Sequence, residues 1–152
     1  MTQRLDYASA APAGVKALGA VYGFVMQSGL DPLLVDLVYL RISQINGCAY
    51  CLGKHHSDLL AKGVSSEKLA LVQAWPEAGD LFSQREQAAL AWAETVTRVA
   101  ETGVPDEDFQ AVSAVFNDKE LADLTIAITL MNSYNRLAIS FRKTPEAVLA
   151  LS

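Results

Sequence analysis

Both cysteines and both histidines of the chain lie in one short stretch, NGCAYCLGKHHSDLL, residues 46–60. Cys48 and Cys51 are three residues apart, and His55 follows Cys51 by four. On an α-helix, side chains at these spacings share one face, so a helix here would bring the three together. His56 is turned about 100° from His55 and is expected to face solvent or a neighbouring chain. The cluster fits three interpretations: a redox-active dithiol, a metal site, or two buried thiols without a reaction of their own.

The position of Cys48 favours the redox interpretation. Gly47 ends the preceding element, so Cys48 is predicted to start a new helix, where unpaired N–H groups and the helix dipole stabilise a thiolate. An imidazolium at His55 would lower the pKa of a neighbouring thiol further. The thiolate is the form of cysteine that reacts. We also expect the helix start to leave Cys48 exposed to an external dithiol.

The other interpretations have weaker support. Structural zinc usually takes four ligands from two separate pairs, and the second pair is missing, so we expect no metal and no cofactor. Inert packing of two small thiols beside a core histidine remains an alternative. A thioredoxin-like fold is disfavoured because no strand precedes the motif. Which cysteine reacts first stays open at this point, because the helix start favours Cys48 and the one-turn spacing to His55 favours Cys51.

Helical periodicity dominates the chain, and no segment is a convincing β-strand. Asp31 and Pro32 suit a helix N-cap and first turn, and Ser83 with Glu86 matches a capping box. We therefore predict an all-α fold, a helical bundle of roughly seven or eight helices joined by short connections. The helices are expected over residues 12–28, 32–45, 48–62, 65–75, 84–102, 105–116 and 118–142, with a short helix after Pro145.

Composition limits the classes of function. The length of 152 residues suits a single domain, residues 1–152, and the net charge of −5 argues against a phosphate-binding surface for nucleic acid. The N-terminus lacks the pattern of a signal peptide, and no apolar run is long enough to span a bilayer. We therefore expect a cytoplasmic protein without membrane contact. In that compartment, a disulfide is more often transient and catalytic than structural.

The segment DLVYLRISQINGCAYCLGKHHSDLLAKG resembles the core of the AhpD-like alkylhydroperoxidases, in the carboxymuconolactone decarboxylase superfamily. That family's pattern is Glu, eleven residues, Cys-x-x-Cys, three residues and His. It falls here on Asp36, Cys48, Cys51 and His55, with Asp in place of the family's Glu. The resemblance continues through FSQREQAALAWAE and ELADLTIAITLMNSYNRLAISFR, and so covers nearly the whole chain.

The resemblance implies a thiol-dependent peroxidase, an oxidoreductase of the alkyl hydroperoxide reductase type, with a redox core at about residues 31–63. Cys51 would attack the hydroperoxide, Cys48 would resolve the product, and His55 and Asp36 would relay protons. Family members are re-reduced by another thiol system, so the implied partner is a dithiol donor, either protein-bound lipoyl or thioredoxin-type. They are commonly trimers or hexamers, which implies a homo-oligomer.

Two alternatives accompany this hypothesis. A redox-sensing or thiol–disulfide exchange protein with little peroxidase turnover would need the same dithiol. The superfamily's lactone decarboxylation does not depend on Cys-x-x-Cys, so the dithiol argues against it.

Three polar residues lie among apolar residues of a predicted helix, namely Asn132, Asn135 and Arg136. They would either line the mouth of the site and pair with Asp36, or form a hydrogen-bonded anchor between helices or subunits.

Overall fold

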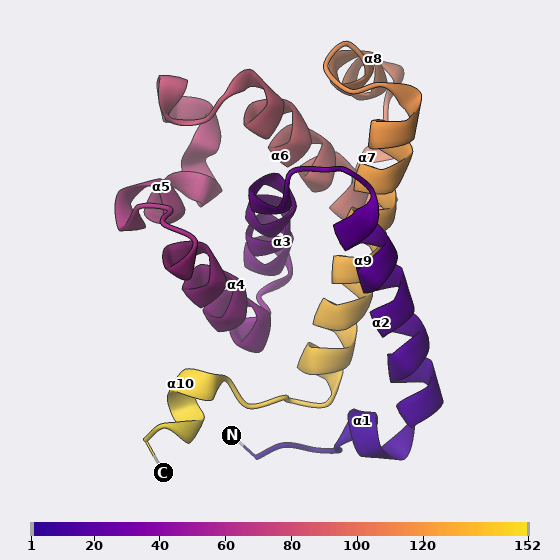
Figure 1. Ribbon diagram of the computed structural model, residues 1–152, viewed down its shortest axis with the longest axis vertical. Helices are drawn as coiled ribbons and strands as arrows, with labels where there is room; N and C mark the ends of the chain where they lie inside the picture. Colours follow the sequence, from indigo (N-terminus) through magenta and orange to yellow (C-terminus); the bar gives the residue numbers. More distant parts are fainter. Residues whose placement is uncertain (1, 152) are drawn as a thin grey trace.

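The computed structural model of the chain describes residues 2–151. Within this range all regular structure is helical, which confirms the all-α prediction (Figure 1). Two short 3₁₀ segments, Val72–Glu77 and Gly79–Leu81, connect α5 to α6. The α-helices are α1 (Tyr7–Ala10), α2 (Pro12–Gln27), α3 (Pro32–Asn46), α4 (Ala49–Ala61), α5 (Ser66–Leu71), α6 (Gln84–Thr97), α7 (Val99–Thr102), α8 (Asp106–Ser113), α9 (Asp118–Ser140) and α10 (Glu146–Leu149).

The described residues form ten α-helices, so the predicted seven or eight is too low. One difference is a break at Arg98, whose φ of −98° and ψ of 32° split the helix predicted over residues 84–102 into α6 and α7. Another is α1, a single turn in which the Asp6 side chain accepts hydrogen bonds from the N–H groups of Ala8 and Ser9. Single turns carry too few residues to show a helical period in sequence.

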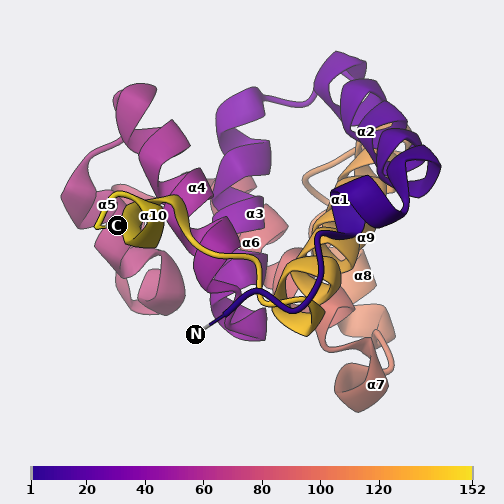
Figure 2. The ribbon, with the colours of Figure 1, turned by 90° about the horizontal axis from the view of Figure 1, so that it is seen from below.

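Helix α3 is the central element of the fold. Apolar residues on nearly all of its sides are buried, and it packs against α4, α6 and α9 (Figures 1 and 2). Tyr39 and Ile42 join Leu124 and Ile128 of α9 in one apolar cluster. A second cluster has members from α3, α4, α5 and α6 and from the segment between α5 and α6, namely Leu37, Leu40, Leu59, Leu69, Val72, Phe82 and Leu90. Burial of a large apolar side chain contributes about 1.5–3 kcal/mol, so the two clusters hold α3 firmly.

The end of α3 sets the direction of the segment that follows. Gly47 has a φ of +69°, and its N–H donates to the carbonyl oxygens of Ser43 and Gln44. A residue with a Cβ is strained in this left-handed conformation, so glycine suits the position. The turn directs the chain into α4, with Cys48 as its N-cap, as predicted.

The two ends of the chain meet beside α4. The N–H of Arg4 donates to the carbonyl oxygen of Phe141 over 2.9 Å, and the rings of Tyr7 and Phe141 lie 5.8 Å apart. Both ends lie at the same end of the molecule as the start of α4 (Figure 1). Among residues 2–151, none of the helices has both the length and the apolar character needed to cross a membrane.

Candidate functional site

The two cysteines form a disulfide at the start of α4. Their Cα atoms lie 5.4 Å apart, and the Cys48 sulfur accepts a hydrogen bond from the N–H of Cys51 over 3.4 Å. Cys48 is only 1% exposed and Cys51 is 5% exposed. The expected exposure of Cys48 is therefore wrong. The residues that follow α9, from the other end of the chain, line a cavity over this helix start.

His55 is buried beside this disulfide and packs against Tyr39, with ring centroids 5.3 Å apart. Burial lowers the pKa of His55 from 6.5 to about 4, although the nearby carboxylate of Asp36 acts in the opposite direction. His55 is therefore a neutral imidazole at neutral pH, so it does not supply the positive charge that would lower the pKa of a neighbouring thiol. A neutral ring can accept a proton from a thiol. His56 is exposed, as its position around the helix predicts.

Asp36 is also buried, and its carboxylate forms an ion pair with Lys62 at the end of α4. Among residues 2–151, the Nδ1 atom of His55 has no hydrogen-bond partner. The carboxylate of Asp36 therefore does not hold this nitrogen directly, although both residues line the same cavity. Lys62 was not among the residues expected at the site, yet its position seven residues after His55 places it two turns further along the same helix face.

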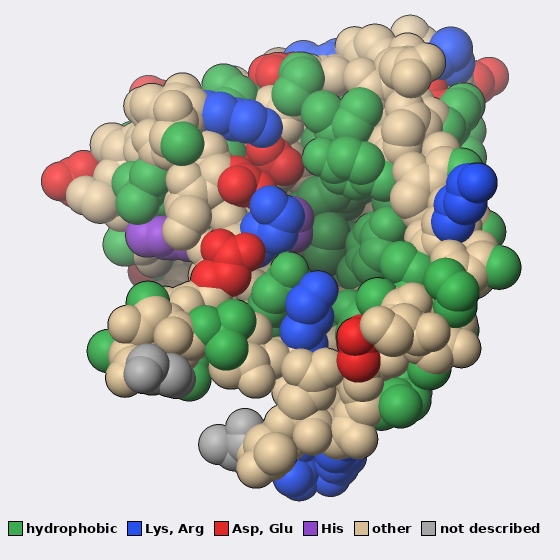
Figure 3. All heavy atoms as spheres, turned by 60° about the horizontal axis from the view of Figure 1, so that its bottom comes forward, with side chains coloured by type: hydrophobic (Ala, Val, Ile, Leu, Met, Phe, Trp, Pro, Cys, Tyr) green, Lys and Arg blue, Asp and Glu red, His purple; other side chains and the backbone are tan. Residues whose placement is uncertain are grey.

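A cavity of about 280 Å³ brings Asp36, Cys51 and His55 together, and we call it the Cys51 cavity. Its charged residues are balanced, with Lys54 and Lys143 beside Asp36 and Asp58. Figure 3 shows a hollow on this side of the molecule, with hydrophobic side chains inside and charged side chains along one edge. The apolar and aromatic part of the lining consists of Tyr7, Ala8, Val15, Tyr22, Tyr50, Met131, Tyr134 and Ala138.

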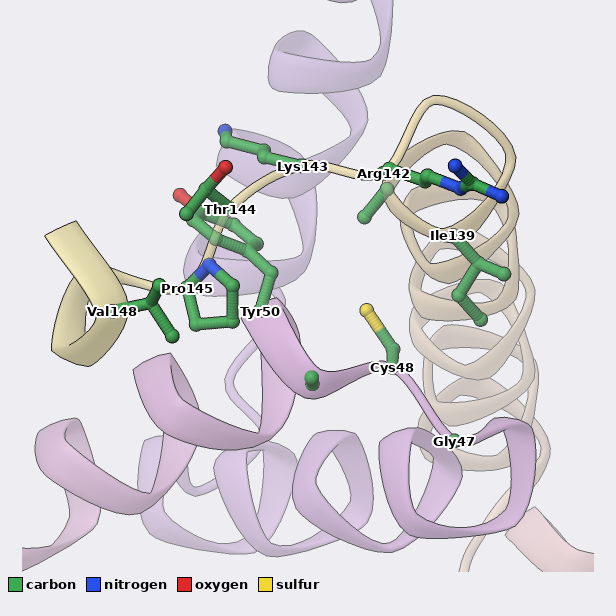
Figure 4. A pocket seen from close by; sticks show the side chains of 11 residues that line it. Gly47, Cys48, Tyr50, Ile139, Arg142, Lys143, Thr144, Pro145 and Val148 are labelled. Atoms are coloured by element: carbon green, nitrogen blue, oxygen red, sulfur yellow. The ribbon is translucent and has the colours of Figure 1, made fainter. Parts of the chain in front are cut away.

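A second cavity, of about 300 Å³, lies at Cys48, and we call it the Cys48 cavity. Figure 4 shows the sulfur of Cys48 pointing towards the segment that follows α9, with Arg142 extending over Ile139. Of the two cysteines, Cys48 lines only this cavity and Cys51 lines only the other. Residues Tyr50, Ala138 and Lys143 line both, and the Lys143 Nζ lies 4.1 Å from the centre of the Tyr50 ring. The two ends of the disulfide therefore face different spaces.

The polar residues of α9 form an anchor between helices. The Asn46 side chain donates to Asn132 and Asn135, over 3.0 Å in each case. Asn135 donates in turn to Ser43 over 3.1 Å, and Arg136 donates to Asn132. Of the two interpretations offered for these residues, the structure supports the anchor, because Lys62 is the residue that pairs with Asp36. The anchor joins α9 to the end of α3, one residue before the turn into the cysteine motif.

Comparison with known proteins agrees with the family expected from sequence. Residues 12–95 match the carboxymuconolactone decarboxylase family. The chain belongs to this family and is an AhpD-like member of it.

Three relatives illustrate the relationship. A protein from Agrobacterium tumefaciens, described as of unknown function and as a candidate antioxidant defence protein AhpD, has a structure with a TM-score of 0.90 at 38% identity, over 95% of this chain and 98% of its own. The uncharacterized protein YdfG of Bacillus subtilis is 34% identical over 140 residues, which are 92% of this chain and 95% of that protein. The alkyl hydroperoxide reductase AhpD of Koribacter versatilis is 41% identical over 51 residues, 34% of this chain and 26% of that enzyme.

Proposed function

We propose that this protein is a thiol-dependent peroxidase that reduces hydroperoxides through the Cys48–Cys51 dithiol. The observation that carries this proposal is the Cys51 cavity, where one sulfur of the disulfide shares a mostly apolar space with a neutral imidazole and a carboxylate. Such a space accepts the uncharged body of an organic hydroperoxide, and the imidazole offers a base for the attacking thiol. The AhpD-like family membership supports the same activity.

The proposed reaction begins at Cys51, because that cysteine lines the cavity with His55 and Asp36. The thiol of Cys51 gives its proton to His55, and the thiolate attacks the O–O bond. A sulfur–oxygen bond forms as the O–O bond breaks, the leaving alkoxide takes a proton and departs as an alcohol, and Cys51 becomes a sulfenic acid. The Cys48 thiolate then attacks this sulfur, forming the disulfide and releasing hydroxide, which becomes water on protonation.

Asp36 would assist by stabilising the protonated imidazole as it forms. Its carboxylate already raises the pKa of His55 against the effect of burial. Lys62 holds the carboxylate in place from the far end of α4. Asp36 is shorter than the family's Glu, but its carboxylate can stabilise the charged His55 imidazole through space, without a direct hydrogen bond. A water that bridges the two side chains would have the same effect.

An external thiol donor would return the disulfide to the dithiol, for which the family resemblance suggests protein-bound lipoyl or thioredoxin-type donors.

We also infer that the protein is a homo-oligomer, a trimer or hexamer. Several large apolar side chains remain exposed, among them Phe109 and Ile126, which support association.

The experiment that tests the peroxidase proposal combines turnover with trapping of the sulfenic acid. We expect the wild type to consume hydrogen peroxide or an organic hydroperoxide with dithiothreitol as donor, and Cys51→Ser to lose this activity. A dimedone-type reagent should label Cys48→Ser after peroxide and should not label Cys51→Ser. The reverse labelling would assign the attack to Cys48. Thiol–disulfide exchange without any peroxide consumption would favour the redox-sensing alternative.

A further inference from the structure

We propose that the Cys48 cavity binds a low-molecular-weight thiol that carries a carboxylate, with its sulfur at Cys48 and its carboxylate at Arg142. The binding site is defined by the cavity alone. The inference rests on the proposed function only where it assigns this thiol to the reduction of the disulfide in the peroxidase cycle. It assigns the reduction step to a small anionic thiol, in place of the protein-bound lipoyl or thioredoxin-type donor that the family resemblance suggests.

The shape of the cavity favours a small donor. Cys48 is 1% exposed, so a cysteine on the surface of another protein cannot reach its sulfur without moving the covering segment. The cavity of about 300 Å³ lies at the lower end of the range for small-molecule sites. Its walls come from the turn into α4 on one side and from residues 142–145 with Val148 on the other (Figure 4).

The charge of the lining favours an anion. Arg142 and Lys143 line the Cys48 cavity, and its lining contains neither Asp nor Glu. This cationic character is unusual for a chain with a net charge of −5, and the Cys51 cavity has two carboxylates that balance its two lysines. The nearest acid in sequence, Glu146, is exposed and is not part of the lining.

Within the described part of the chain, Arg142 is the lining cation whose guanidinium is free to pair with the carboxylate. It is half-buried, and no carboxylate within residues 2–151 forms an ion pair with it. Lys143, in contrast, is directed towards the rings of Tyr50 and Tyr7, with its Nζ 4.1 and 5.7 Å from their centres. Guanidinium groups bind carboxylates through paired hydrogen bonds, so Arg142 offers an unoccupied partner for the donor.

The reaction at this site is a thiol–disulfide exchange. The donor thiolate attacks the Cys48 sulfur, which forms a mixed disulfide and releases Cys51 as a thiolate. A second donor thiolate attacks the donor's sulfur in the mixed disulfide and releases Cys48. Two donor thiols are oxidised to one disulfide, the protein disulfide is reduced by two electrons, and the two protons from the donors reach Cys48 and Cys51. Since Cys51 faces the other cavity, its thiolate leaves on the side where a hydroperoxide would bind.

The test measures reduction of the oxidised protein directly, by alkylation of the freed thiols and mass spectrometry. The probes are 3-mercaptopropionate, 2-mercaptoethanol and cysteamine. Each rate is compared at equal thiolate concentration and divided by the rate of the same thiol with a small-molecule disulfide, because a thiolate of higher pKa attacks faster. We expect the anionic thiol to react about five- to tenfold faster than the neutral one, and cysteamine to be the slowest. Arg142→Gln should bring the ratio of the 3-mercaptopropionate rate to the 2-mercaptoethanol rate close to one, whereas Arg142→Lys should retain much of the preference.

Arg98→Gln is the matched control, because it removes the same charge from a residue that lines neither cavity. Equal rates for the three thiols, or a preference that survives Arg142→Gln, would overturn the inference. So would a lipoyl or thioredoxin-type protein that reduces the disulfide faster than every small thiol and is unaffected by Arg142→Gln. Peroxide consumption with the neutral dithiothreitol is measured in parallel. Its loss alone would contradict the peroxidase proposal, and its retention without an anion preference would contradict only the inference about the donor.

Discussion

Burial decides the charge of His55. The residue packs against Tyr39 inside the protein, and the cost of placing a charge there lowers its pKa to about 4. In the unfolded chain the same imidazole has a pKa near 6.5. The unfolded state therefore binds more protons than the folded state between these two values, which makes stability depend on pH.

This difference gives a prediction for stability. At pH 7 both states hold a neutral His55, and its contribution is fully present. As the pH falls from about 6.5 towards 4, the unfolded state gains a proton and the free energy of unfolding should decrease, by about 3 kcal/mol for this group at the lower end. Urea unfolding of the oxidised protein at a series of pH values measures the change.

His55→Gln is the comparison for that measurement, because it cannot titrate in this range. The variant should show a smaller loss of stability than the wild type between pH 6.5 and 4. An identical pH dependence in both proteins would mean that the pKa of His55 is not lowered by folding.

At the scale of helices, the anchor between α3 and α9 positions the cysteine motif. Asn135 is fully buried, and it connects Asn46 and Ser43 near the end of α3 to the long helix α9. The anchor lies directly before Gly47, whose left-handed conformation sets the direction of α4. A buried polar group that loses its partner costs more than an ordinary hydrogen bond contributes, so the anchor is sensitive to substitution.

We expect Asn135→Ala to lower the free energy of unfolding by about 1–3 kcal/mol, because Asn46 and Ser43 lose a buried partner. The variant should also lose peroxidase activity beyond its loss of stability, since the turn before Cys48 is no longer held. Ser133→Ala on the same helix is the control, because its hydroxyl bonds only to the carbonyl of Thr129 at the surface. Equal effects of the two substitutions, in denaturant unfolding and in turnover, would contradict the role of the anchor.

At the scale of the whole molecule, the two chain ends complete the site. Arg4 and Tyr7 pair with Phe141, and the residues after Phe141 form one wall of the Cys48 cavity. The disulfide at the start of α4 lies between the two cavities. Segments from the N-terminal and C-terminal parts of the chain line these cavities. This arrangement allows a hydroperoxide and a thiol to approach the disulfide from different sides.

The oligomeric state gives a prediction at this scale. The surface formed by α8 and α9 exposes Phe109 and Ile126 beside Trp92. We expect light scattering after gel filtration to give the mass of a trimer or hexamer for the wild type, and a smaller species for Ile126→Asp, because a carboxylate opposes burial in an interface. Leu60→Asp, on exposed apolar surface of α4, is the control and should leave the mass unchanged. A monomeric wild type, or an unchanged mass for Ile126→Asp, would contradict the prediction.

Local patterns in the sequence predicted much of the fold. The period of apolar residues, the capping pairs such as Ser83 with Glu86, and the glycine at position 47 depend on neighbours a few residues away. They located the main helices and placed Cys48 at a helix start. The one-turn spacing of Cys51 and His55 matches their position in the same cavity, because helical geometry is local. Cys48 is the N-cap, outside the helical backbone, and it lines the other cavity.

Contacts between distant segments decided the rest. The burial of Cys48 depends on residues 142–148, the partner of Asp36 is Lys62 at the far end of α4, and the neutral state of His55 follows from its packing against Tyr39. Spacing along a helix predicts which side chains share a face, but it does not determine what covers that face. Solvent exposure, charge state and the presence of two separate cavities at one disulfide depend on that cover, and so only the tertiary structure determined them.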